Sequence, residues 1–147
     1  MRRLTTGLIC VLLAACGEPE GSPEQAVRAW LDAAEAYAED KDRSGLMSMI
    51  ADNYADARGY DRTQLGNLIR FYFLRQDAVE FVSNINDIKI MGESAAQVDL
   101  AVVMAGTNAD AIGFRADAYN FELELENLDG EWKLIGARWA PVGREMR

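Results

Sequence analysis

Histidine is missing from this sequence, and cysteine occurs only twice, at Cys10 and Cys16. Without histidine the chain cannot build the Ser-His-Asp or Cys-His arrangements that activate a nucleophile. It also lacks the ligands for a zinc site built on His or Cys. Several classes of hydrolase and metalloenzyme are therefore excluded, and we predict neither a metal nor a cofactor.

Positive charge is scarce as well. The chain has 15 Lys and Arg against 24 Asp and Glu, which gives a formal net charge of −9 at pH 7. Such a surface repels nucleic acid, because affinity for nucleic acid comes mainly from contacts with phosphates. It gains nothing from an anionic lipid surface either. We therefore expect no nucleic-acid partner and no electrostatic attraction to a membrane.

Long hydrophobic runs are absent except at the start of the chain. There, Arg2 and Arg3 precede an uncharged stretch from Leu4 to Ala15. This stretch is too short for a transmembrane helix, which needs about 20 predominantly apolar residues. Its length and its basic start are typical of a secretory signal peptide.

The end of this stretch, Leu13-Ala14-Ala15-Cys16, consists of an aliphatic residue, two small residues and a cysteine. It resembles the lipobox of bacterial lipoproteins, whereas Cys10 follows the bulkier residues Leu8 and Ile9. The alternative is an ordinary secretory signal that is cleaved at an Ala-x-Ala site. The lipobox resemblance implies that residues 1–15 are removed as a signal peptide and that Cys16 becomes the acylated first residue.

Acylation of Cys16 implies a membrane partner, since two or more acyl chains anchor a protein stably. It also leaves no free cysteine for a disulfide. Residues 16–22 would form a short tether rich in Gly and Pro, and residues 23–147 a single domain. In Gram-negative lipoproteins an Asp after the cysteine tends to retain the protein in the inner membrane. Gly17 therefore implies the outer membrane, with the domain on the periplasmic side.

Apolar residues at helical spacing predict three helices in the first part of the domain. The segment Ser22-Pro23-Glu24-Gln25 has the sequence of an N-cap and a capping box, so the first helix begins there. A second helix is predicted over 44–54, with Ser44 as its cap, and a third from Asp61 to about Gln76. The apolar stripes are Val27, Trp30, Leu31, Ala34 and Tyr37; Leu46, Met49, Ile50 and Tyr54; and Leu65, Leu68, Ile69, Tyr72 and Phe73.

From residue 79 onwards the apolar period changes from 3.6 to 2, which predicts four antiparallel strands. The apolar residues change parity at Asn86-Asp87 and again near Ala118. Each change predicts a β-bulge, because an extra residue reverses the facing of everything after it. Asp129-Gly130 predicts a tight hairpin turn, and Pro141 ends the last strand.

A two-residue turn at Asp129-Gly130 sets the register of the last two strands by counting outwards from it. Leu125 then faces Leu134, Leu123 faces Gly136, and Phe121 faces Arg138. These pairs share the apolar face of the sheet.

The opposite face of the last strand would carry Ile135 and Trp139, beside the glutamates of its neighbour. Exposed apolar area on one strand marks an interface. We therefore predict a contact there with a second copy of the chain or with an envelope protein. The alternative is that residues 142–147 fold over this area.

Three helices followed by a four-stranded antiparallel meander with bulges resemble the nuclear transport factor 2-like superfamily, the cone of the ketosteroid isomerases and SnoaL-like cyclases. The resemblance covers residues 23–141 and implies an α+β fold in which three N-terminal helices pack on a curved sheet. The sequence departs from the pattern in one respect. Many members have a short hairpin between the second and third helices, and residues 55–60 leave little room for one.

The resemblance also implies a pocket at the open end of the cone. We predict that Trp30, Tyr37, Tyr72, Phe121 and Arg138 line it and bind a small amphiphilic ligand. Arg138 has three interpretations: an edge residue that extends to solvent, a partner for a buried carboxylate, or an anchor for an anionic ligand. The last of these would place it at the mouth of the pocket.

An isomerase or lyase site is the alternative function. Ketosteroid isomerases use an aspartate base with oxyanion donors that include a tyrosine. The candidate donors are Tyr37, Tyr54 and Tyr72, and the candidate bases are Asp99, Asp110 and Asp117. The predicted strands place no carboxylate at an inward position, so we expect binding without catalysis.

A third hypothesis is a structural subunit of an envelope complex, and three observations separate the possibilities. An inward carboxylate within reach of a tyrosine favours an enzyme, an open apolar pocket favours binding, and a filled cone with Trp139 exposed favours a subunit. Asp40, Asp42, Ser44 and Gly45 also match the first half of a calcium loop. The last ligand position of that loop is Ala51, which cannot bind the ion, so we interpret the segment as a turn between helices.

Overall fold

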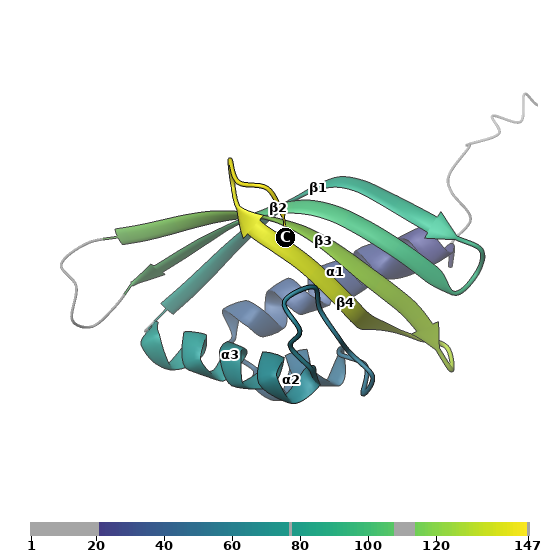
Figure 1. The fold of residues 1–147 in the computed structure, drawn as a ribbon, viewed down its shortest axis with the longest axis horizontal. Coiled ribbons are helices and arrows are strands. Elements are labelled where there is room, and N and C mark those ends of the chain that lie inside the picture. Colours follow the sequence, from purple (N-terminus) through teal and green to yellow (C-terminus); the bar gives the residue numbers. More distant parts are fainter. Residues whose placement is uncertain (1–20, 77, 108–113, 147) are drawn as a thin grey trace, which may run out of the picture.

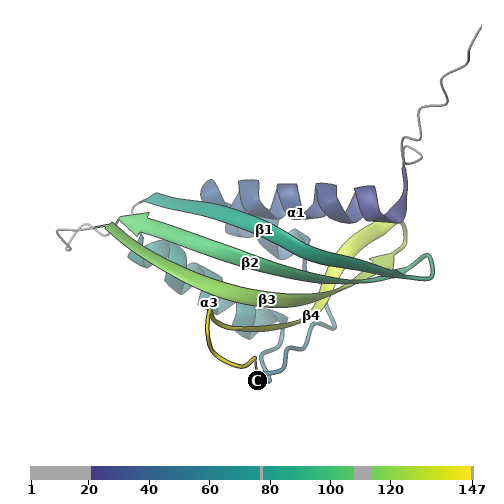
Figure 2. The ribbon, with the colours of Figure 1, turned by 90° about the horizontal axis from the view of Figure 1, so that it is seen from above.

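A computed structural model describes residues 21–76, 78–107 and 114–146. Its strands form one antiparallel sheet in the order β1-β2-β3-β4. The sheet arches over the helices (Figure 1), and α1 runs alongside β1 when the sheet is seen from above (Figure 2). The predicted α+β fold is thus confirmed. The elements are α1 (Pro23–Glu39), α2 (Arg43–Ser48), α3 (Arg62–Arg75), β1 (Ala78–Met91), β2 (Ala95–Thr107), β3 (Phe114–Leu128) and β4 (Glu131–Pro141).

The predicted signal peptide, Cys16 and most of the tether lie outside the described residues. None of the helices in the described ranges is long and apolar enough to cross a membrane.

Helix α1 begins as the sequence predicts. The Ser22 side chain accepts a hydrogen bond from the backbone N–H of Gln25 at 3.2 Å, and Pro23 occupies the first turn. The Gln25 side chain accepts in return from the N–H of Gly21 at 2.9 Å. Val27 and Leu31 are buried on the face that packs against the sheet.

The second helix is shorter than predicted, because α2 ends at Ser48 instead of extending to residue 54. Its cap is the side chain of Asp42, which accepts from the N–H of Gly45, and not Ser44. Beyond α2 the backbone bonds to β4, with the N–H of Ala51 donating to the carbonyl of Leu134 at 3.0 Å. Residues 49–57 thereby cover the free edge of the last strand. Their backbone groups bond to β4, so these groups are not available to continue the helix.

A short hairpin does join this segment to α3. Ala55 and Asp61 form an antiparallel bridge, and the Asp56 carboxylate accepts the N–H groups of Arg58 and Tyr60 at 2.9 Å each. Asp61 then caps α3 with a complete capping box to Gln64. The segment that the sequence indicated as having little room for a hairpin thus holds a single bridge rather than longer strands.

Of the two predicted bulges, one is confirmed and one is wrong. The register of β1 against β2 shifts between Ile85 and Asp87, as predicted. The pairing of β2 with β3 runs without a shift from Thr107 and Phe114 to Ala95 and Glu126, so no bulge exists near Ala118. The parity change in the sequence has another cause. An aspartate, Asp117, occupies an inward position in line with Tyr119.

A bulge that the sequence did not reveal lies in β4. Asp129 and Gly130 have positive φ angles of 54° and 90°, and Leu125 pairs with Leu134 as predicted. Ile135 is then an extra residue, because Glu124 pairs with Gly136. A Cβ at Gly136 would lie 3.2 Å from the carbonyl oxygen of Ala55, so glycine lets the edge segment approach the bulge closely.

This bulge exchanges the faces of the residues that follow it. Leu123 pairs with Ala137 and not with Gly136, and Phe121 pairs with Trp139 and not with Arg138. The predicted register is therefore wrong beyond Glu124.

The core occupies the end of the domain near the β3–β4 hairpin. Its members come from α1, from residues 50–54 and from the inner face of the sheet. Val27, Tyr54, Ala96, Val98 and Leu125 are the least exposed of them, at 2% or less. Towards the other end of α1 the helices and the sheet diverge, and a cavity takes the place of the core.

Candidate ligand-binding site

The cavity has a volume of about 550 Å³ and lies between α1, α3 and the inner face of the sheet. That size suits a small organic molecule. Its helix side includes Trp30, Leu31, Ala34, Glu35, Ala38, Leu65, Leu68, Ile69, Tyr72 and Phe73. Its sheet side includes Phe81, Ser83, Leu100, Val102, Met104, Asp117, Tyr119, Phe121, Leu123, Ala137 and Trp139.

Aromatic rings form much of the sheet side of this cavity. Phe121 and Trp139 stack with centroids 6.2 Å apart and planes 22° apart, and Tyr119 contacts Phe121 at 6.3 Å. The guanidinium of Arg58 lies 4.6 Å from the centroid of the Trp139 ring system and donates to the Trp139 carbonyl. The rings thus hold one another in place, which gives the cavity a preformed wall.

Two carboxylates reach the cavity. Glu35 projects from α1, and its Oε2 accepts the hydroxyl proton of Ser83 in β1 at 2.6 Å. Asp117 projects from β3 at the inward position that the absent bulge leaves open, and its side chain is exposed. One of them, Asp117, is a candidate base predicted from the sequence, whereas Glu35 was not predicted to be a site residue.

Tyr72 lies close enough to Asp117 for the charge of the carboxylate to affect the pKa of the phenol. Burial raises the pKa of the Tyr72 phenol above its ordinary value of 10.0, and the charge of Asp117 and the neighbouring Tyr119 raise this pKa further. Tyr72 therefore remains a neutral phenol, able to donate a hydrogen bond, throughout the physiological pH range. The hydroxyl of the third candidate donor, Tyr54, donates instead to Asp56 at 3.1 Å.

The indole of Trp30 is a further polar group in the wall. Its Nε1 is buried and has no hydrogen-bond partner among the residues that the structure describes. An unpaired buried donor lowers the stability of the folded protein by roughly 1–3 kcal/mol. The indole N–H is therefore a group that a ligand acceptor would stabilise.

Three of the five predicted ligand-binding residues, Trp30, Tyr72 and Phe121, line the cavity. Tyr37 does not, because its ring packs against Gly45 at the corner between α1 and α2. Arg138 does not either, since the bulge at Ile135 turns it to the convex face. The binding role of the three aromatic residues stays a prediction.

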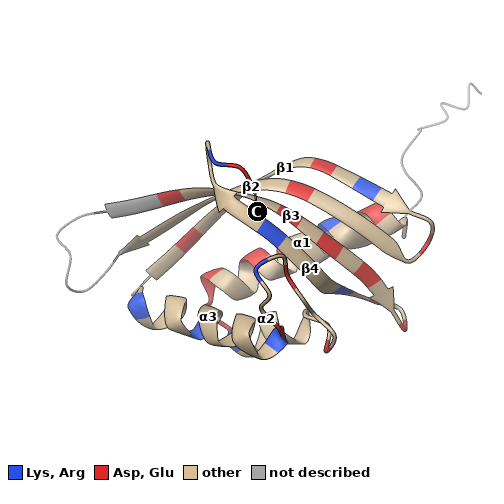
Figure 3. Ribbon diagram, viewed as in Figure 1, with Lys and Arg blue, Asp and Glu red and all other residues tan. Residues whose placement is uncertain are grey.

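Arg138 belongs to a row of charges on the convex face. The row follows neighbouring positions in the strand register: Asp87 lies beside Asp99, Asp99 beside Glu122, and Glu122 beside Arg138 (Figure 3). Arg138 forms an ion pair with Glu122, whose side chain is only 14% exposed. Of its three interpretations, the structure supports a partner for a mostly buried carboxylate.

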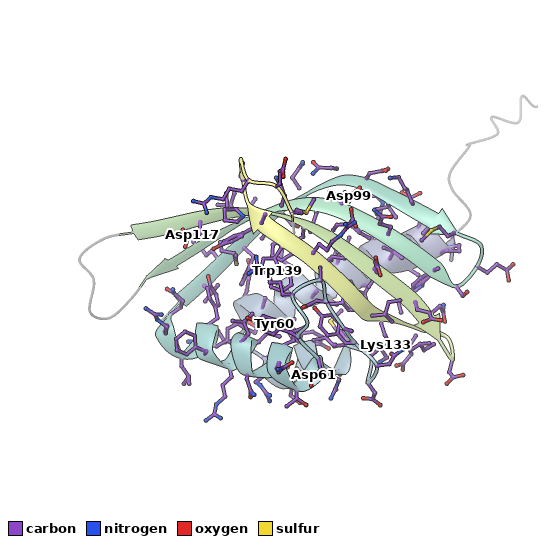
Figure 4. All side chains as sticks on the ribbon, in the orientation of Figure 1. Tyr60, Asp61, Asp99, Asp117, Lys133 and Trp139 are labelled. Atoms are coloured by element: carbon purple, nitrogen blue, oxygen red, sulfur yellow. The ribbon has the colours of Figure 1, made fainter. Side chains whose placement is uncertain are left out.

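Trp139, the main residue of the predicted interface, does not lie on the outer face of the sheet. Trp139 points inwards and Ile135 is partly buried at the bulge, so they form no exposed patch. The predicted bases also separate. Asp99 lies on the convex face (Figure 4), whereas Asp110 lies outside the described residues.

The expected turn between α1 and α2 is limited to residues 40–42, because Ser44 and Gly45 lie in α2 and Asp42 is its cap. In the part of the chain that the structure describes, no three acidic, histidine or cysteine side chains gather into a metal site.

A second hollow, of about 700 Å³, lies beside residues 57–58 and the C-terminal segment that includes Pro141, Arg144 and Glu145. Although it is larger, two chain segments alone bound it. The cavity under the sheet is bounded by helices and strands together, so it is the stronger candidate for a specific small ligand.

Two cavity residues that were not predicted, Ser83 and Glu35, could have been recognised from the sequence pattern. Ser83 is polar at a position of β1 where Val79, Phe81 and Ile85 are apolar. Glu35 follows Leu31 by four residues, which places it on the buried face of α1. A polar residue that interrupts an apolar stripe is a candidate for a binding site.

No protein-family model matches the sequence, and no curated protein matches it. Solved structures do resemble it. A candidate dehydratase of the nuclear transport factor 2-like family from Streptomyces avermitilis superimposes with a TM-score of 0.71 at 12% identity, over 82% of this chain and 97% of that one.

Two further structures carry other names. A ketosteroid isomerase-like protein from Erwinia carotovora atroseptica gives a TM-score of 0.67 at 14% identity, over 82% of this chain and 96% of that one. A hexachlorocyclohexane dehydrochlorinase from Novosphingobium barchaimii gives 0.68 at 14% identity, over 84% and 89%. Identities this low show the fold alone. The domain has the nuclear transport factor 2-like cone, and this fold occurs with several chemistries.

Proposed function

We propose that this protein is a lipid-anchored envelope protein whose cone cavity binds a small, largely apolar molecule. The observation that carries the proposal is the cavity of about 550 Å³, whose walls are mostly aromatic and aliphatic and hold few polar groups. A preformed apolar cavity with a small number of polar groups is the usual form of a small-molecule site.

The binding proposal is tested with a pair of substitutions on α1. Ala38 lines the cavity, whereas Ala36 is exposed on the same helix. Nile red, a neutral apolar dye, should bind the natural protein and Ala36→Trp with a saturable rise in fluorescence. Ala38→Trp places an indole in the cavity and should weaken this binding by about tenfold or more. The ring occupies space that the dye needs, and a filled site does not accept added volume without strain. Equal binding by the two variants would place the dye elsewhere and contradict the proposal.

The anchor is proposed from Leu13-Ala14-Ala15-Cys16, and Gly17 supports the outer membrane as its location. Cells that express the natural chain and Cys16→Ser are labelled with a fatty-acid analogue and then fractionated. The natural chain should carry the label and sediment with outer membranes, whereas the variant should do neither. Labelling of the variant would refute acylation at Cys16.

A lyase or isomerase function is the second candidate, and the pair Tyr72 and Asp117 favours it. Asp117 could accept a proton from a carbon of the substrate, while the neutral phenol of Tyr72 donates a hydrogen bond to the oxyanion that forms. No hydrogen bond joins the two side chains in the described part of the structure, so binding remains the first proposal.

Exchange of carbon-bound hydrogen tests this second function. Cyclohexanone is incubated with the protein in heavy water, and incorporation of deuterium next to the carbonyl is followed by NMR. Catalysis predicts exchange faster than in buffer, slowed strongly by Asp117→Asn and less by Tyr72→Phe. Exchange at the buffer rate counts against proton transfer to this ketone and leaves the binding proposal in place.

A further inference from the structure

The charge inside the cavity has one sign. Its described lining contains two acidic residues, Glu35 and Asp117, and no Lys or Arg. This is the reverse of the expectation from the sequence, in which Arg138 at the mouth would attract an anionic ligand.

Two arginines of the helical layer bind backbone carbonyls instead. Arg43 donates to the carbonyl of Gly66 at 2.9 Å, and Arg62 donates to the carbonyls of Ile50 and Met47 at 3.1 and 2.7 Å. Neither arginine is among the cavity-lining residues. These contacts hold the layer together. Among the described residues, Glu35 forms no ion pair with a Lys or Arg side chain.

Glu35 is held in a defined orientation. The hydroxyl of Ser83 donates to Oε2, which fixes the carboxylate against β1 and leaves Oε1 without a hydrogen bond in the described structure. A carboxylate fixed in this way can accept a strong, charge-assisted hydrogen bond from an ammonium group.

The aromatic wall favours the same ligand. Phe121 and Tyr119 lie on the sheet side, with Phe81 beside them and Tyr72 opposite on α3. The Trp139 ring stacks on Phe121 and already has the Arg58 guanidinium over it, so the other four rings are the ones available to a ligand. The negative face of an aromatic ring attracts an organic cation, and the attraction grows when water is excluded. Carboxylates and aromatic rings in one cavity are therefore complementary to a cation with an apolar body.

We propose that the cavity selects a hydrophobic organic cation, an amine with an aromatic or aliphatic body, and that Glu35 is its main counter-charge. Asp117, at the exposed edge, adds negative potential at the entrance. This inference rests on the proposed ligand-binding function and specifies the class of ligand.

Three probes with the same body separate charge from shape: phenylbutylamine, phenylbutanol and phenylbutyrate. Isothermal titration calorimetry should rank the amine above the alcohol by about tenfold or more, since a hydrogen bond to a charged group and a desolvated cation–π contact can each contribute that much. The anion should bind more weakly than the alcohol, because like charges repel in the cavity.

Glu35→Gln keeps an oxygen that can accept from Ser83 and should reduce the affinity for the amine to that for the alcohol. Asp32→Asn is the matched control, because it makes the same change of charge at an exposed position of α1. It should leave the ranking unchanged.

The outcomes separate the inference from the function on which it rests. Equal affinities for the amine and the alcohol, both lost in Ala38→Trp, would overturn the charge preference and uphold ligand binding. Tighter binding of phenylbutyrate would also overturn the preference. No binding of any probe, together with no saturable binding of Nile red, would refute the binding function and the inference together.

Discussion

Phe121 and Trp139 pair directly across β3 and β4, with their ring centroids 6.2 Å apart. This stack exists because Ile135 is an extra residue in β4. Without it, Arg138 would face Phe121 and Trp139 would lie on the convex face. One inserted residue thus determines that the cavity has an aromatic wall and no arginine.

Neighbouring substitutions in β4 test this register. Trp139→Ala removes a stacked ring from the cavity wall and should lower the free energy of unfolding by about 2–4 kcal/mol. Arg138→Ala removes the ion pair with Glu122 from the convex face, where the Arg138 side chain is 48% exposed, and should cost about 1 kcal/mol or less. Both values come from equilibrium unfolding in urea. A larger loss for Arg138→Ala than for Trp139→Ala would contradict the bulge.

The tyrosines predict how stability changes at alkaline pH. Burial raises the pKa of the Tyr54 phenol above its ordinary value of 10.0, and the charge and hydrogen bond of Asp56 raise it further. The pKa of the Tyr72 phenol is also raised, mainly by burial. The folded protein therefore holds these protons more tightly than the unfolded chain does. Their contribution to stability is complete below the unfolded value of 10.0 and is lost as the pH rises through the folded pKa.

Tyr54→Phe removes one of these titrating groups. The variant loses the hydrogen bond to Asp56 and should be less stable at neutral pH, but its stability should fall less steeply above pH 10 than that of the natural protein. Urea unfolding at a series of alkaline pH values measures the slope. An unchanged slope in both Tyr54→Phe and Tyr72→Phe would show that neither phenol is linked to folding.

Asp56 organises the turn that leads into α3. Its carboxylate accepts the N–H groups of Arg58 and Tyr60 and the hydroxyl of the buried Tyr54. Asp56→Ala leaves these donors unpaired and should cost about 2 kcal/mol of stability. Asp56→Asn, whose amide oxygen can still accept the two N–H groups, should lose clearly less. Equal losses for the two variants in urea unfolding would show that the hydrogen bonds are not the cause.

Features that depend on neighbouring residues were predictable from the sequence. Ser22 caps α1, Asp61 caps α3, and the turn at Asp129-Gly130 pairs Leu125 with Leu134. The bulge at Asn86 was also visible, because long apolar side chains lie on both sides of it and their parity changes clearly.

Features that depend on distant segments were not predictable. The end of α2 at Ser48 and the bulge at Ile135 both involve hydrogen bonds between residues 49–57 and β4. Nothing in either segment alone indicates this pairing. The false bulge near Ala118 came from the assumption that inward residues are apolar, and that assumption hid Asp117.

The same reasons explain the outcome for the candidate site. Trp30, Tyr72 and Phe121 were found because aromatic residues on an apolar stripe or strand face point inwards. Asp117 was named as a candidate base but was not placed inwards, because inward residues were assumed to be apolar, and Glu35 was not considered. Arg138 was misplaced by the single register shift in β4.

The central claim is that ligands bind under the sheet, and consecutive valines in β2 test it directly. Val102 lines the cavity, whereas the next residue, Val103, lies on the convex face and is 41% exposed. Methyl-labelled protein is titrated with phenylbutanol and followed by NMR. The account predicts saturable shifts of the Val102 and Leu100 methyl signals with little change at Val103 and Val82. Saturable shifts at Val103 and Val82, with Val102 unchanged, would place the binding site on the convex face and contradict it.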